Sequence, residues 1–188
     1  MTTLALGLLL FLGIHLLPTV PAARQALALR FGDQRYRGVF SLVSLAGLVL
    51  IVVGYRSAGS GAQLFAPMPA AIAIAPAAMT LSFILFAAAN MRTHLRRALG
   101  HPMLLGTLIW AGVHLAANGD ARGTLLFGSF LAYAVLDLVS AIRRRAVKSF
   151  EPALKQDVIA VVAGVVIALL VMTFHRVVFG PAVVSFGV

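Results

Sequence analysis

Residues 101–120 read HPMLLGTLIWAGVHLAANGD. From Pro102 to Asn118 the stretch contains no Asp, Glu, Lys or Arg. At a rise of 1.5 Å per residue, its length is close to the lower limit of about 17 residues for a helix that crosses a bilayer. The stretch therefore predicts a membrane-spanning helix with one ionisable side chain, His114, inside it.

The rest of the chain repeats this pattern. It is 61% hydrophobic and 11% charged, whereas a soluble domain is about half apolar and a quarter charged. We predict an all-α, polytopic membrane bundle of about six transmembrane helices, folded as a single domain over residues 1–188. The expected spans are Thr3–Pro18, Val39–Tyr55, Met68–Asn90, Pro102–Asn118, Thr124–Ile142 and Val158–Val178. The first span lacks the basic n-region of a signal peptide, so we expect it to remain as a helix.

The charged residues fall on alternate connections between these spans. Connections one, three and five carry twelve of the fifteen basic residues. By the positive-inside rule they face the cytoplasm, so both termini face away from it across the inner membrane. The net charge of +10 then reflects topology and attraction to anionic lipid headgroups, and it does not indicate a nucleic-acid partner. The chain has no cysteine, which excludes disulfides, thiolate nucleophiles and Fe–S clusters.

Polar residues within or at the ends of spans are costly in hydrocarbon and usually face the interior of a bundle. The chain has seven of them: His15, Asn90, His101, His114, Asn118, Asp137 and His175. Four have an ordinary structural interpretation. Asn90 and His101 mark helix ends, and Asp137 lies about one turn before the basic run 143–145, with which we expect it to form an ion pair. His175 is expected at the membrane surface, and His94, in a basic connection, is expected in solvent.

His15 and His114 are different because both fall at interior depth. Two neutral imidazoles from facing helices are what bis-histidine ligation of haem requires. The alternative is a pair of buried histidines that hydrogen-bond to neighbouring helices and stabilise their packing. Trp110 and Asn118 lie four residues before and after His114 on the same helix face. They either support a ring cofactor and its ligand, or fill the core and end the helix, and the spacing leaves both interpretations open.

The chain resembles the NnrU family of bacterial membrane proteins. The resemblance is carried by LLLFLGIHLLPTVPAARQALALRFGDQRYRGVFSLVSLAGLVLIVVGY, LGHPMLLGTLIWAGVHLAANGD and LLFGSFLAYAVLD. It covers about residues 4–145, whereas the apolar segment 158–178 is generic. NnrU proteins are linked to nitrite and nitric oxide metabolism, so the resemblance implies a function in denitrification.

The plant and cyanobacterial 15-cis-zeta-carotene isomerase is similar to this family, and it is a membrane protein that binds haem b. Its two haem-ligand histidines fall in motifs that match GIH and WAGVH in this chain. The resemblance therefore implies that His15 and His114 are the axial ligands of the iron of haem b. From their positions in the chain, we expect Trp110, Asn118 and His101 to support this site.

Two departures separate this chain from the isomerase. Ala111 stands where the isomerase has a cysteine, three residues before the second ligand. The histidines that the isomerase carries in the helix matching residues 124–142 are missing here. Redox-dependent ligand switching through sulfur is therefore not expected.

The stretch GHPMLLG also resembles a motif of membrane methyltransferases that bind S-adenosylmethionine. Gly100 stands where the motif has arginine, and Glu151 is the sole glutamate after Pro102, so the paired glutamates of those enzymes are missing.

The sequence thus predicts a membrane protein that binds haem b through His15 and His114. Its expected role is in nitrogen-oxide metabolism or in isomerase-like chemistry on a lipid-soluble substrate. The alternatives are a non-catalytic accessory or sensor protein and a methyltransferase centred on His101.

Overall fold

The computed structural model describes residues 1–147 and 149–179. Within them the elements are α1 (Thr2–Leu16), η1 (Leu17–Thr19), α2 (Pro21–Phe31), α3 (Asp33–Ser57), α4 (Pro69–Ala89), α5 (His94–Leu99), α6 (Pro102–Asn118), α7 (Ala121–Arg143) and α8 (Leu154–Phe179). This described part of the chain has no strand, and one isolated bridge joins Gln63 to Asp120. The predicted all-α membrane bundle is confirmed.

Six of these helices correspond to the six expected spans. Five of them (α1 with η1, α3, α4, α7 and α8) are long and apolar enough to cross a membrane, and α6 is a shorter apolar helix. The helices α3 and α8 begin several residues before the expected spans, and their first turns carry Asp33 and Asp157. A carboxylate is favourable at a helix N-terminus, so each helix continues past the apolar segment that hydropathy detects.

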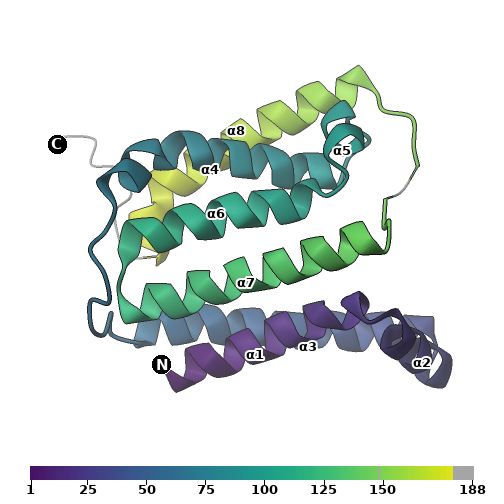
Figure 1. Cartoon of the computed structure of the whole chain (residues 1–188), viewed down its shortest axis with the longest axis horizontal. Coiled ribbons are helices and arrows are strands. Elements are labelled where there is room, and N and C mark those ends of the chain that lie inside the picture. Colours follow the sequence, from purple (N-terminus) through teal and green to yellow (C-terminus); the bar gives the residue numbers. More distant parts are fainter. Residues whose placement is uncertain (148, 180–188) are drawn as a thin grey trace.

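Two further helices form in connections that were expected only to link spans. The helix α2 ends at Gly32, whose φ of +82° ends the right-handed helix. The helix α5 is capped by the buried Thr93, whose Oγ1 accepts the N–H of Arg96 at 2.9 Å. Both lie, with the connection between α7 and α8, at one end of the bundle, which we call the basic end (Figure 1). The N-terminus and the last turn of α8 lie at the opposite end, which we call the terminal end.

The long helices stand side by side in the order α3, α1, α7, α6, α4, α8 (Figure 1). The closest packing joins α1 to α3, and α4 packs against both α6 and α8, while α7 contacts both α1 and α6. A core cluster fills the seam where the α1–α3 pair meets α7, and its buried members are Leu4, Leu8, Leu12, Ile51, Leu126 and Phe127. The helix α7 therefore joins the α1–α3 pair to the other helices.

Small residues bring the paired helices close together. A Cβ atom added to Gly7 of α1 would lie 2.6 Å from the backbone nitrogen of Ile51 in α3. One added to Gly164 of α8 would lie 2.5 Å from Cα of Ile84 in α4. Between α4 and α6, the buried Ser82 donates its hydroxyl to the carbonyl of Gly106 at 2.8 Å. Close backbone approach and interhelical hydrogen bonds are the usual means of association for helices in lipid.

Candidate functional site

His114 lies one turn before the end of α6, at the terminal end. Its Nδ1 is 2.8 Å from the carbonyl oxygen of Trp110. A carbonyl only accepts, so Nδ1 carries the proton and Nε2 of the neutral ring keeps a free lone pair. The imidazole is half-buried, with ring centroids 4.7 Å from Phe127 and 5.4 Å from Trp110. Histidines that ligate metals are commonly oriented by such a hydrogen bond through their other nitrogen.

The expected stripe of Trp110, His114 and Asn118 is present on one face of α6. Asn118 donates Nδ2–H to the carbonyl of His114 at 2.6 Å, and its own carbonyl accepts from Gln63 Nε2 at 2.9 Å. Asn118 therefore closes the end of α6. In the described part of the chain it makes no hydrogen bond to the imidazole of His114. Of the two flanking residues, it is Trp110 that orients the imidazole of His114, through its carbonyl oxygen.

His175 of α8 brings a second imidazole to His114. The two ring centroids are 6.4 Å apart and the planes differ by 25°. His175 also packs against Phe179, with centroids 5.0 Å apart. It is half-buried beside the other ring, a contact that was not predicted. The sequence held a signal for this: His114 precedes the end of α6 by four residues, His175 precedes the end of α8 by four, and both helices run from the basic end to the terminal end.

His15 lies in the last turn of α1, toward the basic end. Its Nδ1 is 2.6 Å from the carbonyl of Phe11, so it has the same tautomer as His114, with Nε2 free. Its ring stacks on Phe11 at a centroid distance of 4.2 Å and meets the edges of Phe40 and Tyr133 at 5.1 and 6.3 Å. Its surroundings are aromatic on three sides.

The structure does not bring His15 and His114 together. His15 faces Tyr133 of α7 and His114 faces Phe127 of the same helix; six residues of helix correspond to about 9 Å along the axis. In the described part of the chain no ring contact joins the two imidazoles. The imidazole that contacts His114 is that of His175, with the two rings stacked and their centroids 6.4 Å apart.

A polar chain leads from the basic end toward His15. Tyr133 donates its hydroxyl to Asp137 Oδ2 at 3.1 Å, and Asp137 Oδ1 is 3.8 Å from the guanidinium of Arg144. The expected ion pair between Asp137 and the basic run is confirmed. Tyr133, which was not singled out from the sequence, connects this pair to the imidazole of His15.

His101 occupies the N-cap position of α6, as expected, but its side chain makes no capping hydrogen bond. It lines a cavity of about 190 Å³ together with Arg96 and Phe150. This volume is below the roughly 300–1,000 Å³ of sites that enclose drug-sized ligands. The cavity is therefore too small to enclose S-adenosylmethionine, which counts against the methyltransferase interpretation.

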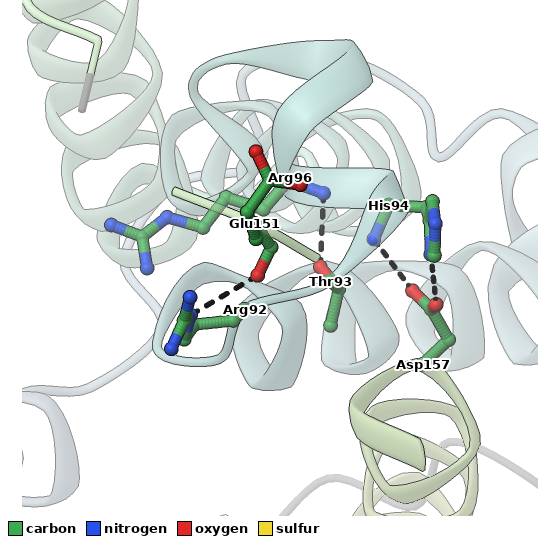
Figure 2. A network of polar contacts seen from close by, with 6 residues as sticks. All are labelled: Arg92, Thr93, His94, Arg96, Glu151 and Asp157. Carbon is green, nitrogen blue, oxygen red and sulfur yellow. Dashed lines mark hydrogen bonds and ion pairs between the residues drawn. The ribbon is translucent and has the colours of Figure 1, made fainter. Parts of the chain in front are cut away.

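Two other expectations concern helix ends. Asn90 is the C-cap of α4, as predicted. His94 is exposed, as expected, and in addition its ring nitrogen and backbone N–H both bond the carboxylate of Asp157, at 2.5 and 2.8 Å (Figure 2). Beside them Arg92 donates Nε–H to the carbonyl of Glu151 at 3.1 Å. These bonds tie the turn after α4 to the start of α8.

Comparison with known proteins gives one match. The family model described as NnrU protein matches residues 3–183. The match runs past residue 145 and so includes α8. No curated protein and no solved structure matches the chain.

Proposed function

This chain is an integral membrane protein of the NnrU family, and on that premise we propose that it binds b-type haem through His114. The observation that carries the proposal is the pair of imidazoles from α6 and α8, with ring centroids 6.4 Å apart. His175 is proposed as the second residue that would hold the iron. His15, the second ligand that the family resemblance implies, is the competing choice and is tested in the same experiment.

The ligand set favours haem over a bare metal ion. Within residues 1–147 and 149–179 no group of three or more His, Cys, Asp or Glu side chains is placed to hold a metal. A bare transition-metal ion in a protein usually needs three or four such ligands. Haem iron receives four nitrogens from its macrocycle, so one or two imidazoles from the protein are enough.

The chain's own residues hold and orient the ligand. The carbonyl of Trp110 fixes His114 in the tautomer that presents Nε2, and the rings of Trp110 and Phe127 exclude water from it. Ala111, which is fully buried, offers no sulfur as an alternative ligand. When bound, the haem would supply one-electron redox chemistry. We propose that this chemistry serves nitrite and nitric oxide metabolism.

Isomerase-like chemistry on a lipid-soluble substrate is the second candidate. A groove of about 410 Å³ between α1 and α7 supports it, because its walls include Leu8, Leu12 and Leu125 and a single polar side chain, Ser129. Organic extraction of the purified protein tests it: a polyene identified by its absorption spectrum is expected, and its loss on substituting Leu12→Trp is the control.

The haem proposal is tested by absorption spectroscopy of the protein purified in detergent from haem-replete cells. We expect a Soret band and sharp α and β bands after reduction with dithionite. The His114→Ala variant should lose these bands, and His175→Ala should convert the spectrum to that of a five-coordinate haem. His15→Ala and His94→Ala, each folded by size-exclusion chromatography, should keep the wild-type spectrum.

Two results contradict parts of this proposal. A colourless, folded wild-type protein means that the imidazoles are packing residues of a non-catalytic membrane protein. A spectrum that survives His175→Ala and is lost in His15→Ala assigns the iron to His15 and His114.

A further inference from the structure

The cavity beside His101 lies at the basic end, between three parts of the chain. It is lined by the end of α4, by α5 and the first turn of α6, and by the connection that follows α7. Its polar lining residues are Arg96 and His101, and its apolar ones include Met103, Val147 and Phe150. With basic side chains on one side and apolar walls on the other, this small cavity suits an amphiphilic anion.

Arg96 brings a positive charge to this cavity, and among the described residues it pairs with no carboxylate. The ion pairs of the described residues join Arg37 to Asp33, His94 to Asp157 and Arg144 to Asp137. Arg96 takes part in none of them. It makes one side-chain hydrogen bond, from Nη1 to the carbonyl of Met91 at 3.3 Å, and its guanidinium lies 5.0 Å from the ring centroid of Phe150. Figure 2 shows its side chain extending away from the His94–Asp157 pair.

The remaining donors of Arg96 are therefore available to an anion. A guanidinium has five N–H groups in a planar fork, of which this one uses a single group on the protein. A half-buried charge of this kind is stabilised when an anion accepts two parallel hydrogen bonds, the geometry that phosphate oxygens match.

His101 adds a second donor on the same cavity. The chain turns sharply before it, at Gly100 with φ +71°, and its side chain makes no hydrogen bond to the start of α6. The first turn of α6 also lines the cavity, and the N–H groups of a first turn have no partner within the helix. These groups add to the attraction for an anion that Arg96 already provides.

We propose that this cavity binds the phosphate group of an anionic phospholipid headgroup. The basic connections share this end of the bundle (Figure 1), where headgroups meet the protein surface, and the apolar walls suit the glycerol and first acyl carbons of a lipid. A volume of about 190 Å³ takes a phosphate group and excludes a whole nucleotide. The site is independent of the haem proposal.

The test uses the full chain purified in a neutral detergent and measures binding of dihexanoyl-phosphatidylglycerol by calorimetry. Dihexanoyl-phosphatidylcholine and inorganic phosphate are the comparison ligands. The decisive variants are Arg96→Gln and Arg97→Gln, because they remove the same charge from adjacent positions and Arg97 is exposed outside the cavity. Loss of a bidentate charged hydrogen bond predicts at least tenfold weaker binding for Arg96→Gln, and less than twofold for Arg97→Gln. His101→Gln should weaken binding as well.

Each other outcome overturns the proposal. Equal losses in Arg96→Gln and Arg97→Gln mean general attraction to a basic surface. Equal binding of phosphatidylcholine means that negative charge is not recognised. If inorganic phosphate binds as tightly as the lipid, and its binding depends on Arg96, the ligand of the site is soluble phosphate and not a lipid. No binding of the anionic lipid by protein that elutes as a folded species removes the site.

Discussion

Replacement of Gly7 by alanine should separate α1 from α3. The new Cβ would lie 2.6 Å from the nitrogen of Ile51, 2.8 Å from the carbonyl carbon of Leu50 and 2.9 Å from the oxygen of Gly47. All three are backbone atoms, so no side chain can rotate to make room. Since ordinary contact begins at 3.4 Å, α1 must retreat by about 0.8 Å, the difference between 3.4 and 2.6 Å. Overpacking of this kind costs about 1–3 kcal/mol.

The assay is thermal unfolding in detergent, followed through the fluorescence of Trp110, the single tryptophan. For a chain of this size, about 1 kcal/mol corresponds to a shift of about 2–4 °C, so Gly7→Ala should melt about 2–12 °C below the wild type. Gly13→Ala is the matched control, because a Cβ there meets nothing within 4 Å and alanine favours the helix. A Gly7→Ala protein that melts at or above the wild-type temperature refutes the packing argument.

Three further outcomes are expected. Ser82→Ala should destabilise the protein by about 0.6–1.7 kcal/mol, because the hydrogen bond to Gly106 joins α4 to α6. Ser44→Ala is the control and should be neutral in the same melt, because the buried hydroxyl of Ser44 has no partner among the described residues; equal losses in the two variants would discount the bond. Asp120→Ala should lower the free energy of unfolding by about 1 kcal/mol, because Asp120 is the N-cap of α7 and accepts the N–H of Gly123 at 2.9 Å. Asp120→Asn should restore this stability. If it does not, the loss is due to the charge of Asp120. A periplasmic reporter should be active when inserted between α3 and α4 and inactive between α7 and α8, and the reverse pattern would invert the topology.

The number and type of the long helices could be predicted because a bilayer leaves few choices. An apolar segment of span length must satisfy its backbone internally, and a helix does so. The two helices outside the spans, α2 and α5, were not predicted, each for its own reason. The six-residue α5 is too short to show a period, and α2 depends on the helix ends set by Pro21 and Gly32. Neither carries the apolar run that identified the spans.

Part of the geometry around His114 could be predicted from the sequence. The depth of His114 and its stripe with Trp110 follow from spacing along one helix. Which imidazole faces it depends on the lateral order of the helices, and a single sequence does not contain that order. With α7 between α1 and α6, His15 faces Tyr133, and α8 supplies His175.

The cavity beside His101 could not be predicted for a related reason. One of its walls comes from residues after α7 that fold back over the start of α6. Hydropathy treats such a segment only as a link. The position of His101 at a helix start was visible from the proline that follows it, whereas the guanidinium of Arg96 beside it was not.

The placement of α7 between the α1–α3 pair and the other helices sets the order in which the protein can be assembled during synthesis. The α1–α3 hairpin can close soon after its second helix enters the bilayer, and α4 can then pair with α6. The leucine face of α1, which includes Leu4, Leu8 and Leu12, is completed by Leu126 and Phe127, which the ribosome makes much later. Until then lipid covers that face. A chain that stops before α7 therefore leaves the α1–α3 and α4–α6 hairpins unjoined.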